Sequence, residues 1–590
     1  MPVNQGHLEF PDLLMVGGYF VLMLGIGVYF YNRMRHMKDY FSGGNSIPWW
    51  LSGVSFYMTS FSVAAFVFYP SLCYRYGWVG ITLLWVAVPA TFFSATFFAA
   101  RWRRARIDSP VEYLETRYSS LVRQLFAWQG VPVKIIDDGI KLFATGTFIS
   151  ICVGLDIRIS VFAAGSIILV YTFMGGLWAV AVTDFIQFVV LTVGILVILP
   201  LSIVRAGGVG AILEQAPEGF FRPVTEEFGW TYVIPLVLLY ALAWSSINWS
   251  LIQRYYCVPR ERDAVKVGWL VIALYIIGPP MMFFPAIAAT QFLPGLEDAG
   301  KVYPLLCTEL LPAGMLGLAV AAMFSATMST LSADYNVCAS VLTNDVYKRL
   351  VRPRASQSEL VLVGRCMTLV VGAVALLTAF LMARGKAEDL FRIMVTLFGV
   401  ATAPVAVPML LGLVSRRATN QGATAGFLVG IACGLALFFL SRYKHDVQFL
   451  GILWDHKNEN IVIAGLALKM EIVLFLSTAI VTFGVMLLFS LIAPPDSAAR
   501  ARTEAFYARL RTPIGALPED EEIRVARAYI SPFGVVGVSI LLIGVLLLAV
   551  LPWVGGGLVV ALDLALAIVL IALGGVVAWF SRGQTATGTQ

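Results

Sequence analysis

Hydroxyl-bearing side chains crowd the middle of one apolar segment, residues 316–347. They fall within about two turns of the expected helix and are Ser325, Thr327, Ser329, Thr330 and Ser332. A helix in lipid meets no water that can satisfy polar side chains, so this face must contact protein, water or an ion. Hydroxyl and carbonyl oxygens are the ligands that a small, hard cation prefers. The alternative is that these small residues only allow close packing between helices.

Four charged residues lie inside a second apolar segment, residues 124–153: Lys134, Asp137, Asp138 and Lys141. On a helix, the i,i+4 spacing allows Lys134 to meet Asp138 and Asp137 to meet Lys141. One interpretation is that the two pairs only neutralise each other. The other is that one pair faces a central cavity and binds a zwitterionic or charged group of a solute.

Two further carboxylates are candidates for a functional role in the membrane. Asp184 begins another apolar segment, and Asp334 follows the hydroxyl-rich stretch. Because burying a carboxylate in a membrane is expensive, such a residue is a functional candidate by default. Asp184 can bind an ion, cap the start of its helix or lie on an ion-release path. Asp334 can act as an ion ligand or pair with a nearby base.

The segments that must position these residues are long and apolar. Hydrophobic residues make up 59% of the 590 residues and charged residues 13%, against about 45–50% and 25% in soluble domains. This composition indicates a polytopic membrane protein. About fifteen apolar runs of membrane-spanning length lie near 11–31, 49–72, 77–100, 124–153, 159–180, 184–204, 229–252, 267–291, 313–343, 359–383, 388–413, 422–441, 461–492, 533–553 and 557–580.

The residue composition also argues against several classes of function. Seven cysteines without a CxxC pair and four scattered histidines indicate no metal or disulfide framework. No nucleophile constellation suggests an enzyme. Basic residues instead follow alternate segments, at 33–38, 101–106, 254–262, 348–354 and 416–417. The positive-inside rule then predicts an outside N-terminus and a cytoplasmic C-terminus in the cell membrane, and the net charge of +6 reports orientation rather than nucleic-acid binding.

Six short motifs occur in a characteristic order. They are DYFSGGNSIPWW at 39–50, SPVEYLETRY at 109–118, YTFMGGLWAV leading to TDFIQ at 171–187, IQR at 252–254, TNDVY at 343–347, and PVAVP at 404–408 followed by RR and GATAG. This order resembles the sodium/solute symporter family over residues 10–440. The family transports sugars, amino acids, vitamins, carboxylates and iodide.

The resemblance implies an all-α polytopic membrane fold of the LeuT type. Such a fold has one leading helix and two five-helix repeats of inverted orientation, here followed by about four trailing helices. The implied boundaries are a leading helix at 10–35, a first repeat at 36–210, a second repeat at 225–420, peripheral helices at 421–492, a cytoplasmic, partly helical linker at 493–530, and peripheral helices at 531–582.

The resemblance also implies a sodium site. Its ligands would be the backbone carbonyls of Met58, Phe61 and Ala326 with the side-chain oxygens of Ser329 and Thr330. Members with a second sodium site use an aspartate and nearby hydroxyls, which here correspond to Asp184 and Ser332. Ala333 supplies no side-chain oxygen at the neighbouring position of that second site.

The resemblance indicates the substrate-binding residues less directly than the sodium ligands. Sugar carriers of the family have a Glu-Gln pair where this chain has Ala64-Ala65, which argues against a simple hexose. Trp244 corresponds to an aromatic inner gate, although a shift of one residue would assign that role to Ser245. The full set of substrate candidates is Thr59, Ser60, Lys134, Asp138, Trp244 and Asn248.

We therefore expect a sodium-coupled secondary active symporter that imports a small polar organic solute by alternating access. Its partners would be the solute, Na⁺ as coupling ion and the lipid bilayer, with no cofactor, nucleic acid or obligatory protein partner. A proton-coupled transporter using Asp184 is one alternative. A symporter-like sensor that works with a separate signalling partner is the other.

Overall fold

A chain that crosses lipid must satisfy its backbone hydrogen bonds internally, and long helices do this within one segment. The computed structural model describes residues 8–31, 41–60, 62–311, 314–382, 387–441, 447–449, 452–455, 460–463, 466–520, 532–553 and 557–587. Within these residues, ten helices are long and apolar enough to cross a membrane, or thirteen if each bent pair forms one span. The protein is therefore an all-α, multi-pass membrane protein, as expected.

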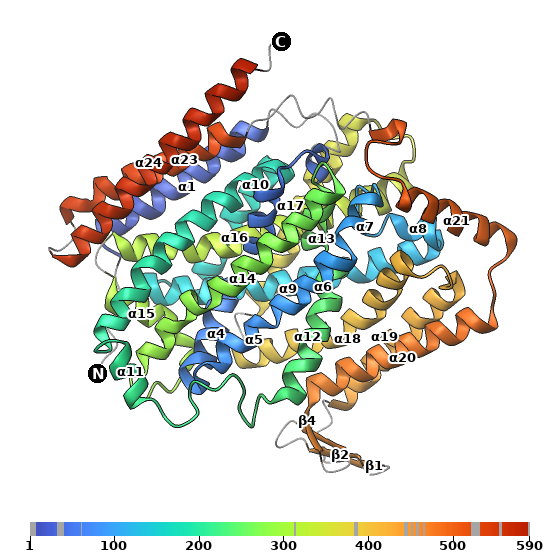
Figure 1. Ribbon diagram of the computed structural model, residues 1–590, viewed down its shortest axis with the longest axis horizontal. Helices are drawn as coiled ribbons and strands as arrows, with labels where there is room; N and C mark the ends of the chain where they lie inside the picture. The colour runs from blue at the N-terminus through green and yellow to red at the C-terminus, as the bar shows by residue number, and fades with distance from the viewer. Residues whose placement is uncertain are drawn as a thin grey trace.

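The leading helix is α1 (Phe10–Tyr31), and the first group of elements follows it along the chain (Figure 1). These elements are η1 (Gly43–Asn45), α3 (Trp49–Thr59), α4 (Val63–Tyr76), α5 (Val79–Trp85), α6 (Ala87–Phe97), α7 (Ala99–Arg104), α8 (Tyr113–Arg117), α9 (Ser120–Val153), α10 (Ile157–Arg205) and α11 (Val209–Gln215). Two predicted spans, 159–180 and 184–204, both fall within α10.

The second group continues to the predicted end of the second repeat. It comprises α12 (Trp230–Ser245), α13 (Trp249–Tyr256), α14 (Glu261–Ala289), η2 (Ala299–Lys301), α15 (Val302–Leu310), α16 (Met315–Val341), the π-type turn η3 (Leu342–Val351), α17 (Gln357–Met382) and α18 (Ala387–Val414). The remaining helices are α19 (Asn420–Ser441), α20 (Met470–Ile492), α21 (Ser497–Arg511), η4 (Pro518–Asp520), α23 (Pro532–Val550), η5 (Leu551–Trp553) and α24 (Leu558–Thr587).

Two helices are broken at corresponding places in the two groups. The pair α3 and α4 bends by 63°, and the pair α12 and α13 bends by 57°. Interrupted helices at matching positions of two repeats are the strongest indication of a central binding site in transporters. A third bent pair, at 118°, is different because α9 turns back into α10 through Gly154, whose φ of +75° suits glycine.

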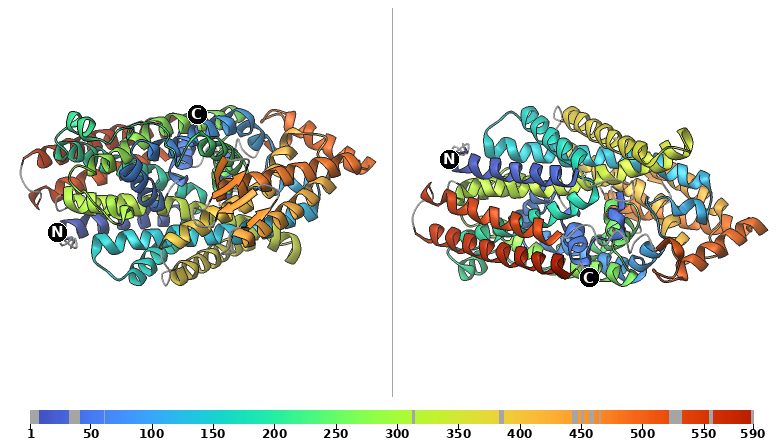
Figure 2. Two further views of the ribbon diagram at one scale, coloured as in Figure 1. Left: turned by 90° about the horizontal axis from the view of Figure 1, so that it is seen from below. Right: turned by 90° about the horizontal axis from the view of Figure 1, so that it is seen from above.

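Helix α16 lies at the centre of the molecule. Every residue of its apolar window is buried, and it packs against α1, α3, α9, α10 and α17. The pair α23 and α24 lies beside α1 on one side, whereas α19 and α20 lie at the opposite end (Figures 1 and 2). The hydroxyl-rich face of α16 is therefore surrounded by protein rather than lipid.

A small antiparallel sheet, absent from the sequence prediction, precedes α20. Its strands are β1 (Val447–Phe449), β2 (Ile452–Asp455), β3 (Asn460–Ile463) and β4 (Leu466–Lys469), in the order β1-β2-β3-β4. Asn460 pairs with Lys469 and Ile463 with Leu466. The helix expected at 461–492 therefore begins only at Met470, because the preceding residues form strands.

Candidate ion-binding and substrate-binding site

The break between α3 and α4 is held by two serines. Ser62 caps α4, because its hydroxyl accepts a hydrogen bond from the backbone N–H of Ala64 at 3.3 Å. Ser60 donates to the carbonyl of Tyr57 at 2.5 Å and contacts the hydroxyl of Tyr275. The last carbonyls of α3 lose their helical donors at this break and become available to a ligand.

Helix α16 is attached directly to this break. The hydroxyl of Thr327 accepts a hydrogen bond from the backbone N–H of Val63 at 3.0 Å. Thr145 of α9 donates to the same hydroxyl at 2.7 Å. The start of α4 is therefore tied to α16 and α9 by one buried threonine that the sequence prediction did not assign.

Four of the five predicted sodium ligands lie on α3 and α16, which pack together. Met58 is in the last turn of α3, and Met58, Ala326 and Ser329 are completely buried. The hydroxyl of Thr330 donates to the carbonyl of Ala326 at 3.1 Å. The fifth predicted ligand, Phe61, lies outside the described residues.

Ser329 supports the choice of ligands most directly. Its hydroxyl is completely buried; it lies near the carboxylate of Asp184 but makes no hydrogen bond of ordinary geometry to any described residue. An unsatisfied buried hydroxyl is costly, so such groups in native structures usually have a ligand or a functional role. Neutral hydroxyl and carbonyl oxygens suit a sodium ion.

Asp184 on α10 is buried against a cation that the sequence prediction placed in a loop. The hydroxyl of Ser55 donates to its carboxylate, and Arg254 Nη2 lies 3.5 Å from it. Arg254 also donates to Ser55 at 2.6 Å and to Thr59 at 3.3 Å. The use of Arg254 as a marker of a basic loop was wrong, because its side chain is completely buried within α13.

Ser332, the other candidate for a second ion, bonds to its own helix. Its hydroxyl donates to the carbonyl of Ser329 at 3.2 Å, and no hydrogen bond joins it to Asp184 within the described part of the chain. One oxygen of Asp184, Oδ1, has no partner among the described residues. The pairing of Asp184 with Arg254 already supplies positive charge where a second cation was expected.

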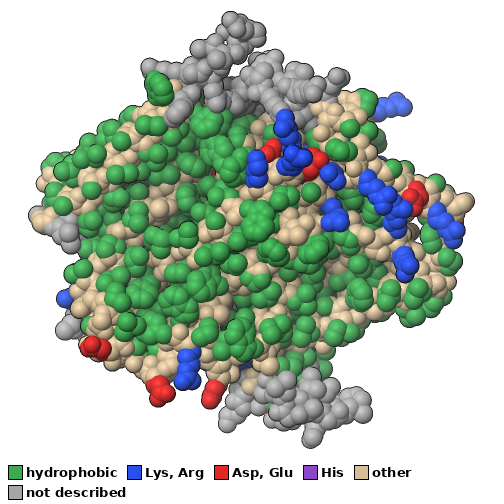
Figure 3. All heavy atoms as spheres, in the orientation of Figure 1, with side chains coloured by type: hydrophobic (Ala, Val, Ile, Leu, Met, Phe, Trp, Pro, Cys, Tyr) green, Lys and Arg blue, Asp and Glu red, His purple; other side chains and the backbone are tan. Residues whose placement is uncertain are grey.

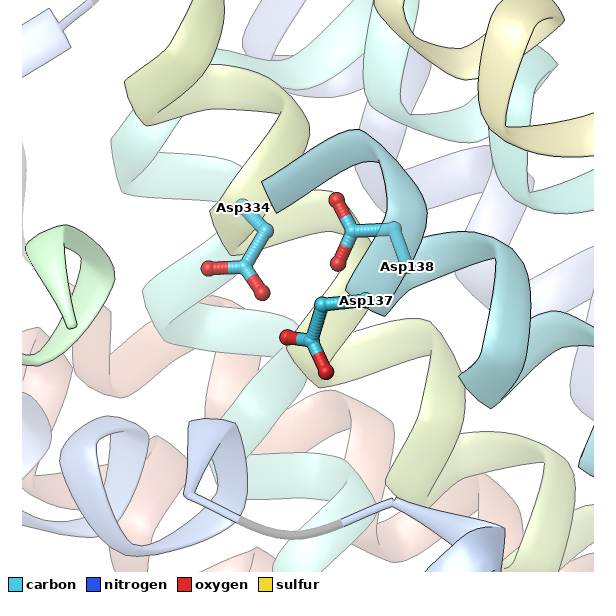
Figure 4. Close-up of side chains that lie close together, drawn as sticks. All are labelled: Asp137, Asp138 and Asp334. Atoms are coloured by element: carbon cyan, nitrogen blue, oxygen red, sulfur yellow. The ribbon is translucent and has the colours of Figure 1, made fainter. Parts of the chain in front are cut away.

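The charged side chains of α9 form one buried cluster with Asp334 of α16. Figure 4 shows the three carboxylates of this cluster, those of Asp137, Asp138 and Asp334. Lys141 Nζ lies 2.7 Å from Asp137, 2.9 Å from Asp334 and 3.4 Å from Asp138. The expected pair of Asp137 and Lys141 is therefore present. Lys134, in contrast, lies 3.1 Å from Asp334 and 3.8 Å from Asp137, rather than beside Asp138 as expected. We call these five residues the charged cluster.

The charged cluster contains one carboxylate more than ammonium groups. Its side chains are between 0% and 14% exposed, and Asp138 Oδ2 has no hydrogen-bond partner among the described residues. The extra carboxylate, Asp138, does not line the cavity described below, where Asp137 and Asp334 are matched by Lys134 and Lys141. The cluster therefore offers both carboxylates and ammonium groups to a charged or zwitterionic ligand.

A cavity of about 270 Å³ joins the charged cluster to the helix breaks. Five of the six predicted substrate residues line it: Thr59, Ser60, Lys134, Trp244 and Asn248. Asp138 does not line it, but Asp137, Lys141 and Asp334 do. Thr330 also lines the cavity, so the candidate ion site and the cavity share a side chain.

Aromatic side chains also line the cavity. Tyr69 and Tyr240 join their hydroxyls at 3.1 Å, and the ring of Trp244 lies 5.3 Å from that of Tyr240. All three line the cavity. Ser245 is completely buried and does not line it, so only Trp244 of the two candidates for the aromatic gate reaches the cavity.

The sequence of this chain is similar to those of known proteins. The family model described as the sodium:solute symporter family matches residues 40–227 and 252–430, which is more than half of the chain. The sodium/sialic acid symporter SiaT of Proteus mirabilis is 26% identical over 478 residues, covering 77% of this chain and 94% of that protein. The human sodium/iodide cotransporter is 28% identical over 452 residues, covering 71% and 68%.

The fold is also found among solved structures. A Na⁺-coupled sialic acid symporter in a substrate-bound outward-open state matches with a TM-score of 0.71 at 23% identity, covering 82% of this chain and 98% of that one. This likeness establishes the fold. It leaves the solute of the present chain to be argued from its own residues.

Proposed function

Because the chain belongs to the sodium:solute symporter family, and so couples solute transport to sodium rather than catalysing a reaction, we propose that it imports a small polar organic solute by alternating access. The solute would carry a positively charged or zwitterionic group. The observation that carries this proposal is the cavity beside two broken helices, which is lined by both charged and aromatic side chains.

Sodium would bind beside this cavity, at the carbonyls of Met58 and Ala326 and the side chains of Ser329 and Thr330, with Phe61 as the fifth ligand. The unsatisfied hydroxyl of Ser329 supports this proposal. Because Thr330 lines the cavity, an ion on its hydroxyl would fix one wall of the solute site. This shared residue provides a physical route for coupling.

The available energy is sufficient for accumulation. One positive charge moving inward gains about 2.3 kcal/mol at 100 mV, and a tenfold sodium gradient adds about 1.4 kcal/mol. Together these support a several-hundredfold accumulation of a solute with no net charge. A zwitterion would meet this condition and still place an ammonium group against the charged cluster.

Asp184 and Ser332 would serve ion release or a second, weaker sodium site. The pairing of Asp184 with Arg254 favours ion release. We further propose the expected orientation, with the N-terminus outside and the C-terminus in the cytoplasm, and the division into a leading helix, two five-helix repeats and trailing helices.

Uptake into proteoliposomes tests the proposed solute class. Amino acids, quaternary amines, carboxylates and hexoses would be compared under an inward sodium gradient, with potassium replacing sodium as the control. We expect uptake of a zwitterion or amine in sodium only. Asp137→Asn should abolish this uptake while retaining sodium binding, because it removes a carboxylate that lines the cavity. Sodium-driven uptake of hexoses alone would contradict the proposed solute class.

A further inference from the structure

A second, larger hollow lies away from the proposed transport site. It has a volume of about 670 Å³ and lies between α7, the end of α18 with the loop that follows it, and α21. Five arginines and no carboxylate are among its described lining residues. The arginines, which define what we call the arginine pocket, are Arg101, Arg104, Arg416, Arg417 and Arg511.

The positive charge of this pocket is only partly compensated. Arg104 lies 3.0 Å from Glu261 and Arg416 lies 3.2 Å from Glu504. Within the residues that the structure describes, Arg101, Arg417 and Arg511 have no acidic partner. An excess of about three positive charges thus surrounds one hollow, which is the condition for binding an anion.

The pocket lies where membrane-spanning helices end. Helix α7 follows directly on the span that ends at Phe97, and Val414, the last residue of α18, is 44% exposed. Ala100, Leu413 and Val414 form its apolar lining. The space-filling view shows lysine and arginine side chains gathered at this end of the molecule (Figure 3). Apolar and basic walls therefore meet in this pocket, at the ends of membrane-spanning helices.

We propose that the arginine pocket binds the phosphate headgroup of an anionic membrane lipid. Arginine presents a planar set of donors that matches phosphate oxygens in pairs and loses water more readily than lysine. Basic pockets between transmembrane helices are suited to such headgroups. The hollow is larger than a phosphate ion alone requires, and its apolar wall provides a place for the first carbons of the acyl chains.

The bound lipid would fasten the C-terminal segment to the transport core. Arg511 belongs to α21, whereas Arg101 belongs to α7 and Arg417 follows α18. Tyr507 of α21 already donates to the carbonyl of Gly412 at 2.9 Å. A phosphate between the three arginines would join the same three elements and replace their mutual repulsion by attraction.

Native mass spectrometry of the purified full-length protein in detergent tests this proposal. Phosphatidylglycerol and phosphatidylcholine would be titrated separately, against the wild type and the triple variant Arg416→Gln, Arg417→Gln, Arg511→Gln. We expect preferential binding of phosphatidylglycerol to the wild type and at least about tenfold weaker binding to the triple variant, since each arginine near a headgroup contributes severalfold.

A matched control removes the same charge elsewhere. Arg260, Arg262 and Arg502 are exposed and lie outside the pocket, and their replacement by glutamine should leave phosphatidylglycerol binding unchanged. Unchanged lipid-free melting temperatures would show that the variants fold. The single variant Arg417→Gln, which loses no ion pair, tests the pocket if the triple variant does not fold.

Two results would overturn the proposal. Equal binding of phosphatidylglycerol to the wild type and the pocket variants would show that the lipid binds elsewhere. Stabilisation of the wild type by inorganic phosphate or glycerol phosphate, without any preference for the lipid, would identify the site as one for a soluble phosphate. Neither result would affect the proposed transport function, because no pocket residue lines the solute cavity.

Discussion

Thr330 connects the two candidate sites at the level of one side chain. Its hydroxyl donates to the carbonyl of Ala326 at 3.1 Å, and the same residue lines the solute cavity. Threonine differs from serine by one methyl group, so the hydroxyl and the methyl can be separated by mutation. The hydroxyl is expected to serve the ion, whereas the methyl only narrows the cavity.

Thr330→Ala and Thr330→Ser should therefore differ. We expect the sodium concentration for half-maximal uptake to rise about tenfold in Thr330→Ala, because loss of one buried polar ligand costs about 1–3 kcal/mol. Thr330→Ser should remain within about twofold of the wild type. Uptake measured over a range of sodium concentrations would check both, and equal effects of the two substitutions would argue against an ion on this hydroxyl.

The ion pair of Arg254 and Asp184 leads to a second prediction, because both side chains are completely buried. Arg254→Gln should lower the free energy of unfolding by about 3–5 kcal/mol, since removal of one partner leaves a buried charge uncompensated. The double variant Arg254→Gln, Asp184→Asn should recover part of this loss. Chemical unfolding in detergent measures both values.

The pair of Lys266 and Asp263, whose lysine is 57% exposed, provides the control, where Lys266→Gln should lower the free energy of unfolding by less than about 1 kcal/mol. Strictly additive effects of the Arg254 and Asp184 substitutions would contradict direct pairing.

Residue types alone identified part of the site. Hydroxyl groups in one apolar segment indicated α16 as part of the site, and charged residues inside another apolar segment indicated α9. Such residues are rare where water is absent. The partners of these residues were not predictable. Arg254 follows an apolar run and reads as a loop residue, and nothing in the local sequence indicates that α13 faces Asp184. Tyr69 and Tyr240 were missed because a tyrosine in an apolar helix is ordinary.

At the scale of elements, the leading helix anchors the central one. Asp12 of α1 accepts hydrogen bonds from the backbone N–H groups of Gly314 and Gly317, both at 2.7 Å. These groups lie at the start of α16, where N–H groups lack helical partners. A Cβ at Gly317 would lie 2.4 Å from the carbonyl oxygen of Asp12, so glycine is required for this close approach.

Asp12→Ala should consequently destabilise the protein by about 1–2 kcal/mol, since it removes the cap of a buried helix. Asp298 caps η2 in the same manner but is exposed. Asp298→Ala should therefore lower the free energy of unfolding by only a fraction of the loss expected for Asp12→Ala. Thermal unfolding in detergent would compare the two. Equal losses would show that α1 contributes nothing specific to the position of α16.

Hydropathy predicted the helices better than their interruptions. The spans expected at 49–72 and 229–252 reach into both halves of each broken helix, because the apolar run continues across each break. Strands β1 to β4 were missed for a related reason. Strands of three or four residues are too short for their alternation to be separated from an apolar helix start.

At the scale of the whole molecule, the segment after α20 folds back onto the core. Arg106 donates to both oxygens of Asp520, at 2.9 and 3.0 Å, and to the carbonyl of Pro513 at 2.9 Å. Asp520 also accepts hydrogen bonds from the backbone N–H groups of Gly515 and Leu517. One ion pair thus holds a segment that is more than 400 positions away in the chain.

This attachment should depend on pH. Burial alone would raise the pKa of Asp520, but the hydrogen bonds from Arg106 and the two backbone groups outweigh it and hold the pKa at about 2. The unfolded value is about 3.9, so the stabilisation is fully present above about pH 4 and is lost as the pH falls through about 2. Limited proteolysis of residues 512–520 should therefore accelerate between these values.

Asp520→Asn should make the segment susceptible to cleavage at neutral pH and remove this pH dependence. Unchanged cleavage of the wild type from pH 7 to pH 2 would contradict the role of the ion pair. The sequence indicated a partly helical linker in this region, and α21 lies within it. Its docking site could not be predicted, because Arg106 and Asp520 have no sequence proximity.

The sodium dependence of the stability of Ser329→Ala is the most direct test of the proposed sodium site. Thermal unfolding of purified protein would be compared in sodium and in potassium, for the wild type, Ser329→Ala and Ser325→Ala. Ser325 is a matched control on the same helix, because its hydroxyl is satisfied by the carbonyl of Ala321 at 2.6 Å.

A ligand at one hundred times its Kd adds about 2.7 kcal/mol of stability to the folded state. We predict that sodium, but not potassium, raises the melting temperature of the wild type and of Ser325→Ala, and that Ser329→Ala loses this increase. A sodium site at the broken helix would be contradicted if sodium stabilised all three proteins equally. It would also be contradicted if sodium did not stabilise the well-folded wild type.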